Sequence, residues 1–369
     1  IIALALIGLA LACAPAAEAA RYEVTNLGIL TGGTASEATA ISDNGRVVGN
    51  SAGFAYIWRP DSGMQKINLL TPDTPYAGPD LTSTDVVAVT GPHSDGDAFG
   101  FLWHANRWAG GLATNLGAAG DAICGEGCDV NPNNQSFANG INDNGVIVGT
   151  STIDGSAGPG EMAATYWPLA GDPIRLGGSS KGSAREIANN GRIAGTHGTR
   201  AALWEDFDDP PVDLGLLPGS TGTLSDALDL NETGTVVGNS EIAPGVLRAF
   251  VWTPGAGMQP IASPNTLSGF SSANAIAPDG TIVGSSFNGT QTRAIVREPG
   301  KPIIDLNTLL PEGTGWTLRS ARDINDDGQI VGVGEIGGAT RAFLLTPIAP
   351  LQVKLEPVTV GDNDVFDLK

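Results

Sequence analysis

Short apolar runs recur along the chain, and each is separated from the next by a polar turn signal. In the first copy, the segments Ala38–Ile41 and Val47–Gly49 flank the polar stretch Ser42–Gly45. An Asn-Gly or Asp-Gly pair between two apolar runs is typical of a type I′ turn, with positive φ at both residues. The pattern therefore predicts that each copy is a hairpin of two short β-strands.

The hairpin block returns at a nearly constant spacing. Full copies occupy residues 38–49, 138–149, 184–195, 227–238, 273–284 and 321–332, and a degenerate copy ends at Gly91. The final glycines of the first and last copies, Gly49 and Gly332, are six intervals apart, about 47 residues per unit, which is a spacing found in propeller blades and other repeat arrays.

Two further strands follow each hairpin. The third ends in tryptophan in five units, at Trp58, Trp103, Trp167, Trp204 and Trp252. The fourth is short, as in Val212–Gly215. No fourth strand follows the last unit, but a matching segment, Tyr22–Gly28, begins the repeat region.

This displaced strand decides between two architectures. A ring of blades closes when one end of the chain completes the blade made by the other, and closure removes open sheet edges. An open solenoid would instead need polar capping units, and the sequence shows none. We predict an all-β protein: a β-propeller of about seven four-stranded blades over residues 20–346, closed by the N-terminal strand, near Leu27, beside the strand near Phe343.

The pattern Ala-x-x-Ile-Asn-Asp-x-Gly-x-Val-Val-Gly, followed by Arg-Ala-Phe-Leu-Trp and Asp-Leu-Gly, resembles the bacterial extracellular repeat known by the letters HAF. The resemblance covers nearly all of residues 22–346. The second unit departs from it by lacking the turn glycine, and the last two units lack the final Trp. The resemblance implies an exported bacterial protein and does not assign a biochemical role.

Both ends of the chain differ from the repeats. Residues 1–12 form an apolar run, and Ala17-Glu18-Ala19 is a small-x-small site, so residues 1–19 are interpreted as an N-terminally incomplete signal peptide. The run is too short for a membrane span, and the residues before Cys13 fit a lipid-attachment motif poorly. We expect a secreted or cell-envelope protein with no membrane insertion after cleavage. Residues 347–369 are interpreted as a tail or linker.

Charge and cysteine content add to this interpretation. The formal net charge is −20, and the pI is about 4.3, which argues against a nucleic-acid partner. Cys124 and Cys128 are separated by three residues, two of them glycines, and in an oxidising compartment this spacing predicts a local disulfide. A redox-active pair is the alternative, but no neighbouring Lys or His would lower a thiol pKa.

Few residues stand out as chemistry-bearing. Aspartates in the repeat turns, such as Asp43, Asp143 and Asp326, are interpreted as turn formers rather than calcium ligands. Trp108 and Trp316 are placed outside the repeat, and with Tyr76 they are candidates for contact with a partner. No catalytic, cofactor or metal residue is assigned, and no cofactor is expected. Among 39 acids, no catalytic pair stands out.

The sequence therefore favours a monomeric binding or interaction scaffold whose partner is an unknown extracellular protein or glycan. One alternative is an enzyme that acts on extracellular glycans through acids in the central channel. A structural surface protein is the other. Whether the chain is an enzyme is left open, and the absence of a catalytic motif favours a non-enzyme.

Overall fold

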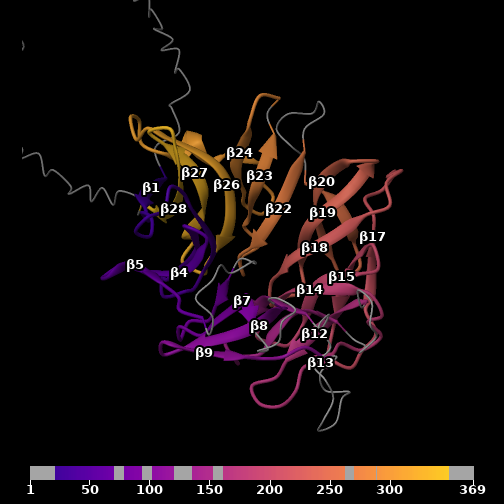
Figure 1. Ribbon diagram of the computed structural model, residues 1–369. Coiled ribbons are helices and arrows are strands. Elements are labelled where there is room, and N and C mark those ends of the chain that lie inside the picture. Colours follow the sequence, from indigo (N-terminus) through magenta and orange to yellow (C-terminus); the bar gives the residue numbers. More distant parts are fainter. Residues whose placement is uncertain are drawn as a thin grey trace, which may run out of the picture.

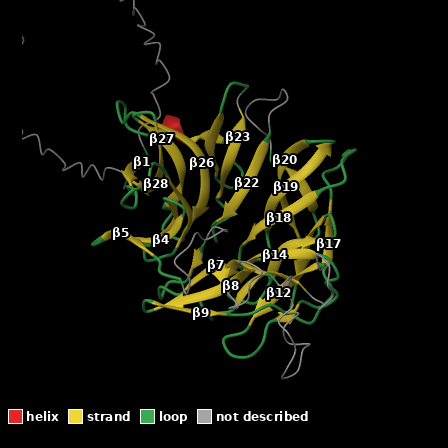
Figure 2. Cartoon of the chain, in the orientation of Figure 1, coloured by secondary structure: helices red, strands yellow, loops and turns green. Residues whose placement is uncertain are grey.

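The computed structural model describes residues 21–69, 79–93, 102–119, 135–152, 161–261, 270–287 and 289–348. Within these ranges the regular structure is almost entirely β (Figure 2). The strands form seven four-stranded antiparallel sheets, which confirms the predicted all-β class and number of blades. One 3-10 turn falls within the described residues, η2 (Leu306–Leu309), and it follows the last strand of the sixth blade.

The blades are numbered along the chain by their innermost strand. Blade 1 contains β2 (Ser36–Ile41), β3 (Val47–Ser51), β4 (Phe54–Arg59) and β5 (Gly63–Lys66). Blade 2 contains β6 (Asp80–Leu81), β7 (Val87–His93), β8 (Leu102–Ala109) and β9 (Leu112–Asn115). Blade 3 contains β10 (Ser136–Ile141), β11 (Ile147–Thr152), β12 (Met162–Trp167) and β13 (Ile174–Arg175).

The remaining blades follow the same order. Blade 4 contains β14 (Gly182–Ile187), β15 (Ile193–His197), β16 (Arg200–Trp204) and β17 (Val212–Gly215). Blade 5 contains β18 (Ser225–Leu230), β19 (Val236–Ala243), β20 (Val246–Thr253) and β21 (Gly257–Pro260). Blade 6 contains β22 (Ser271–Ile276), β23 (Ile282–Phe287), β24 (Thr292–Arg297) and β25 (Ile304–Asp305). Blade 7 contains β26 (Trp316–Ile324), β27 (Ile330–Ile336), β28 (Ala339–Pro347) and β1 (Tyr22–Asn26).

The blades stand around a closed circle (Figure 1). Each innermost strand contacts the innermost strands of both neighbouring blades, and β2 of blade 1 also packs on β27 and β28 of blade 7. The buried apolar side chains fall into seven clusters among the described residues, one at each interface between blades. The core is therefore a ring of interblade layers around a central axis.

The N-terminal strand completes the last blade, as the sequence predicts. β1 pairs with β28 over five residues, from Tyr22 opposite Pro347 to Asn26 opposite Phe343. The Leu27 N–H then donates to the Ala342 carbonyl at 3.1 Å. This antiparallel pairing joins the two ends of the repeat region and supplies a partner to the outer edge of β28.

The last glycine of each full copy is required by close packing of two strands. A Cβ at Gly149 would lie 1.9 Å from the Phe137 carbonyl oxygen on the facing strand. The same oxygen-to-Cβ distance would be 2.0 Å at Gly49, Gly195, Gly238, Gly284 and Gly332. No side chain fits at that distance, so the repeat retains glycine because the first two strands approach too closely for any other residue.

Serines at the start of the innermost strands connect neighbouring blades. The Ser36 hydroxyl of blade 1 donates to the Gly28 carbonyl at 2.6 Å and accepts the Ala342 N–H of blade 7 at 3.0 Å. Ser136 and Ser225 make the equivalent pair of bonds with blades 2 and 4. Each hydroxyl thus satisfies two backbone groups in the preceding blade.

The turn type differs from the prediction. The Gly45 N–H donates to the Ser42 carbonyl at 2.9 Å, and Gly45 has φ +74°. Asn44 is not among the residues with positive φ, so the type I′ prediction, which requires positive φ at both residues, is wrong. The chain instead reverses over the three residues between Ser42 and Arg46, and the Ser42 N–H donates to the Arg46 carbonyl across the base of the turn. Only the glycine of the three is in the left-handed region.

Blade 2 departs from the repeat in two ways. Val87 pairs with Trp108 as Val47 pairs with Trp58, so Trp108 holds the repeat position that the sequence pattern assigned to Trp103. The assignment was wrong because the third strand, β8, extends five residues further. In addition, Asp85 stands where the other units have the turn glycine, and it has φ +65°.

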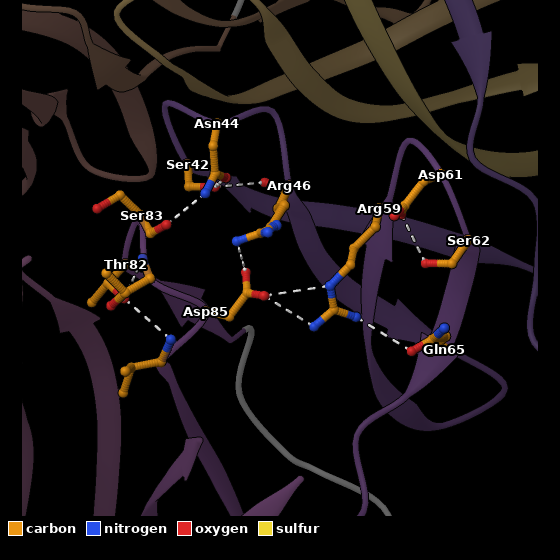
Figure 3. A network of polar contacts seen from close by, with 12 residues as sticks. Ser42, Asn44, Arg46, Arg59, Asp61, Ser62, Gln65, Thr82, Ser83 and Asp85 are labelled. Carbon is orange, nitrogen blue, oxygen red and sulfur yellow. Dashed lines mark hydrogen bonds and ion pairs between the residues drawn. The ribbon is translucent and has the colours of Figure 1, made fainter. Parts of the chain in front are cut away.

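Two arginines of blade 1 hold Asp85 in this unfavourable conformation (Figure 3). The Asp85 carboxylate accepts from Arg46 Nη1 at 2.7 Å and from Arg59 Nη2 at 3.1 Å. The left-handed region is tolerated by aspartate better than by most residues. The paired guanidinium groups therefore compensate for the missing glycine and connect blades 1 and 2.

Replacing Gly149 by alanine should destabilise the protein by about 3 kcal/mol, because the two strands cannot separate without breaking their ladder. Gly245→Ala is the matched control: Gly245 has φ +76° but nothing lies within 4 Å of an added Cβ, so only backbone strain of about 1 kcal/mol is expected. Urea unfolding measures both. Equal losses of stability would contradict the steric argument.

Asp85→Gly should change the free energy of unfolding by less than about 1 kcal/mol, because the relief of strain offsets the lost ion pairs. Asp85→Ala keeps the strain and loses the pairs, so a loss of about 2 kcal/mol is expected. Thermal unfolding of the two variants distinguishes these effects. A glycine variant less stable than the alanine variant would show that strain at this residue is unimportant.

Candidate functional site

A cavity of about 520 Å³ lies at the axis and is lined by residues of all seven blades. Its wall consists of the last residues of the innermost strands and the turns that follow them, such as Thr39–Asp43 of blade 1. The cavity is therefore built from the repeat itself, at the end of the ring where the hairpin turns lie.

The innermost strands carry a β-bulge that shapes this wall. In blade 1 the pairing with β3 passes from Ala38 to Ala40, so Thr39 is the extra residue. The same shift occurs in blades 3 to 7. A bulge removes a residue from the ladder and redirects neighbouring groups. The residue after the bulge is Ala or Gly in blades 1, 3 and 6 and is an acid in blades 4, 5 and 7. In blade 2 the equivalent residue is Asp80.

Three aspartates connect neighbouring blades through backbone N–H groups. Asp323 Oδ1 accepts the Ile324 N–H of its own strand at 2.7 Å, and its Oδ2 accepts the Ile41 N–H of blade 1 at 2.7 Å. Asp229 does the same for Leu230 and for Ile276 of blade 6. In each case the receiving blade has the small residue at the equivalent position, which leaves room for the carboxylate.

The third connection completes the pattern. Asp80 accepts the Ile141 N–H of blade 3 at 2.8 Å and a bond from the Leu81 N–H. Glu186 of blade 4 accepts only the N–H of Ile187, at 2.9 Å. Three carboxylates thus hold two N–H groups each and Glu186 holds one, which accounts for one N–H in every blade. Glu186 Oε2 is the oxygen that remains without a partner among the described residues.

Burial raises the pKa of all four axial acids. It raises the pKa of Asp80 to about 7, with a further increase from the charge of Asp323. The pKa of Asp229 rises to about 8 for the same two reasons, and burial raises that of Asp323 to about 6. Glu186 has its pKa raised well above the usual value by burial and by the charges of Asp80 and Asp229. Low-dielectric surroundings and shared negative charge both favour the protonated form.

The extra residues of the bulges form a second ring in the same wall. Most of them connect to the next blade: the Thr39 hydroxyl donates to the Pro79 carbonyl at 2.6 Å, and Asn139 Nδ2 donates to the Ala184 carbonyl at 2.7 Å. Arg185 pairs with Asp226 of blade 5 at 2.9 Å. Arg322 of blade 7 is exposed and makes no hydrogen bond or ion pair with a residue that the structure describes.

The turns at the mouth of the cavity are joined by hydrogen bonds in which a backbone N–H of one blade meets a side chain of the next. The Ser83 N–H donates to Asp143 at 2.9 Å, and the Asp143 N–H donates to Asn189 at 2.8 Å. The Asp143 carboxylate accepts from the Ser83 N–H, the Ser83 hydroxyl and Asn189 Nδ2, and these three bonds outweigh burial and lower the pKa of Asp143. The equivalent bonds run from Asn189 to Glu232 and from Asp326 to Asp43. We call this set of bonds the turn belt.

Two of the contact residues predicted from the sequence, Trp108 and Trp316, do not line the axial cavity. Trp108 is only 8% exposed and packs between blades 1 and 2, which leaves little of its surface for a partner. Trp316 is half-buried and contacts Phe343 edge-on, with 6.2 Å between ring centroids. Tyr76, the cysteines Cys124 and Cys128, and residues 1–19, which are interpreted from the sequence as a signal peptide, lie outside the described residues. A partner contact at Trp316 or Tyr76 and the Cys124–Cys128 disulfide stay predictions.

Reasoning from sequence missed the axial acids and Arg322. A signal was present: aligning the copies on the buried Ile or Leu places Asp80, Glu186, Asp229 and Asp323 in one column. An acid next to a buried residue in several copies indicates a shared polar role at the axis. The turn aspartates, by contrast, were expected to form turns, and Asp43 and Asp143 do lie in the turn belt.

Two features are absent from the described part of the chain. No helix there is long and apolar enough to cross a membrane. No group of three or more His, Cys, Asp or Glu side chains in those ranges has a geometry that could hold a metal ion.

Comparisons with known proteins place the fold. No family model matches the chain, and no curated protein does, so the HAF resemblance stays a prediction. Among solved structures, streptogramin B lyase is similar with a TM-score of 0.55 and 12% identity, covering 89% of this chain and 98% of that one. A mutant of puromycin hydrolase has a TM-score of 0.53 and 11% identity, over 81% and 50% of the two chains.

The extracellular domain of a putative hybrid two-component system from B. thetaiotaomicron is also similar. Its TM-score is 0.51 at 10% identity, over 89% of this chain and 40% of that one. At such low identities the likeness extends to the fold alone. The chain is a seven-bladed β-propeller.

Proposed function

We propose that this protein is an exported binding module that holds a small, hydroxyl-rich ligand, such as the end of a glycan, in its axial cavity. The observation that carries the proposal is the set of unused groups in the cavity wall. Glu186 Oε2 and the Arg322 guanidinium have no partner among the described residues, while the other acids of the axial ring hold backbone N–H groups.

The two unused groups come from well-separated blades. Glu186 projects from blade 4 and Arg322 from blade 7, and both line the cavity. A ligand at the axis can therefore contact both from different directions. Arginine donates to hydroxyl or carboxyl oxygens, and a protonated carboxylic acid can both donate and accept. This combination suits a ligand with several hydroxyl groups.

The protonation of the axial acids supports a neutral ligand. With raised pKa values, the acids carry less than their full negative charge near neutral pH. The cavity also contains Arg185 and Arg322. An uncharged, polar guest is favoured over an anion, because eight acids and only two arginines line the cavity. The overall charge of −20 is carried mainly elsewhere and serves solubility.

A second candidate function rests on Glu186. A carboxylic acid held protonated beside other carboxylates in a polar cavity is the arrangement that a general acid for glycan cleavage requires. However, Asp80, Asp229 and Asp323 are each engaged by two backbone N–H groups. A partner base or nucleophile would have to leave such bonds, so binding without cleavage is the preferred function.

Glycan-array screening of the intact protein, followed by calorimetry with the best oligosaccharide, tests the proposal. Glu186→Ala and Arg322→Ala should each weaken binding by about tenfold or more, because each removes a hydrogen bond inside the cavity. Glu186→Gln keeps the shape and polarity of the protonated acid and should retain most of the affinity. Arg319→Ala is the matched control, because Arg319 pairs with Glu335 and does not line the cavity.

Two outcomes would overturn the binding proposal. One is that no oligosaccharide binds, and the other is that binding is unchanged by both cavity substitutions. Product analysis with the same oligosaccharide separates the two functions. Cleavage that Glu186→Gln abolishes while binding persists would establish the enzyme instead.

The axial acids should make the protein less stable as the pH rises from about 5 to about 9. Their folded-state pKa values, about 7 for Asp80, about 8 for Asp229 and about 6 for Asp323, lie above the unfolded value. The folded state therefore binds more protons, and the stability gained at low pH is lost as the pH passes through the folded pKa values. Urea unfolding across this range should show a smaller decrease for Asp229→Asn. A stability that rises with pH would contradict the assignment.

A further inference from the structure

Among the described residues, the turn belt lacks the bond from the Asp43 N–H to Ser83, and it is also interrupted at blade 6. The residue there that corresponds to Asp143 and Asn189 is Pro278, which has neither a backbone N–H to donate nor a side chain that accepts. In blade 7, the Asp326 N–H donates to Asp43 of blade 1, as the belt requires. The Asp326 carboxylate, however, has no hydrogen-bond or ion-pair partner among the described residues, because its expected donor is the missing N–H of Pro278.

A cavity of about 420 Å³ lies where the belt is interrupted. It is lined by blades 6 and 7, with Pro278, Pro299, Pro347 and Ile324 supplying apolar surface. Asp326 and Asp279 supply carboxylates. Because the prolines have no N–H, the wall between these acids presents few donors, and a guest that carries its own donors would be complementary to it.

Tyr22 supplies a second, independent sign that this cavity takes a ligand. It is only 8% exposed, it lines the cavity, and its hydroxyl makes no hydrogen bond with a residue that the structure describes. Burial and the nearby charges of Glu298 and Asp279 raise the pKa of Tyr22, whereas Arg21 lowers it. The phenol is therefore neutral at physiological pH and can accept a hydrogen bond from a guest in the cavity.

The charges around the cavity favour a cation. Asp279 is engaged by the Thr281 N–H at 2.7 Å and by the Thr281 hydroxyl. Glu298 is neutralised by Arg21, at 2.5 Å, and by Lys301. Asp326 has no such cation, and burial together with the charges of Asp43, Asp327 and Asp143 raises its pKa. Among the described acids that line this cavity, Asp326 is thus the one whose exposed carboxylate has no donor or cation from the protein.

We propose that the cavity between blades 6 and 7 is a binding site for an alkylammonium or guanidinium group carried on an apolar stem. The cationic head would donate to the Asp326 carboxylate and to the Tyr22 hydroxyl, and the stem would lie against the three prolines. A small diamine or agmatine offers this chemistry, and so does a lysine or arginine side chain of a peptide.

Calorimetric titration of the full chain with two probes tests the proposal. Agmatine represents the free small molecule, and an acetylated, amidated Gly-Lys-Gly peptide represents the side chain of a protein. Asp326→Asn and Tyr22→Phe should weaken binding, by about tenfold for the loss of the charged partner. Pro278→Ala should also weaken it, because the restored N–H can donate to Asp326 as in the other blades.

Asp327→Asn is the matched control, since Asp327 lies in the same turn and carries the same charge but does not line the cavity. Binding that Asp327→Asn weakens as much as Asp326→Asn would reveal only general attraction to an acidic protein and would overturn the site. Binding unchanged by Pro278→Ala and Tyr22→Phe, in variants that unfold at the wild-type temperature, would also overturn it. So would failure of both probes to bind at millimolar concentration. Preference for one probe identifies the source of the cation.

Discussion

One backbone N–H of each innermost strand is held by a carboxylate near the axis, and the need to satisfy these N–H groups organises the centre of the ring. An unpaired N–H in such surroundings costs more than most single hydrogen bonds contribute. The chain meets the requirement with four carboxylates, three of which span two blades. The same groups therefore join the blades, define the cavity wall and fix its protonation. Stability and the chemistry of the site have one origin.

The repeat predicted the parts of the fold that depend on local chemistry. The final glycines indicated a close approach of two strands, and the displaced segment at Tyr22 indicated ring closure; the structure confirms both. Turn type was wrong because an Asn-Gly pair is compatible with more than one turn, and the three-residue reversal depends on how the flanking strands pair. The predicted end of the third strand in blade 2 was wrong because both Trp103 and Trp108 fit the end of an apolar strand. The pairing of Trp108 with Val87 shows which of the two holds the repeat position.

The candidate sites were less accessible to sequence reasoning for a different reason. In a repeat protein, conserved positions build the scaffold, and the positions that break the repeat are the ones free to take other roles. Glu186, Arg322 and Pro278 lie in columns in which several other members connect neighbouring blades. Each departure has meaning only when its neighbours around the ring are known. The interblade partners of a column are distant in sequence, so they could not be read from any one copy.

The number of blades itself supplies a reason for the unused oxygen. A carboxylate has two oxygens, and each aspartate here holds the N–H of its own blade and that of the next. An even ring could be satisfied entirely by such shared pairs. Seven blades cannot, so one blade must satisfy its N–H with an acid of its own, and that acid retains a free oxygen. Blade 4 has this position, and its acid is the longer glutamate, whose carboxylate would meet a Cβ at Gly140 of blade 3 at 2.9 Å. A glycine at that position gives Glu186 the room it needs beside the cavity. The oxygen available for a ligand is thus a consequence of closing an odd ring with bidentate groups.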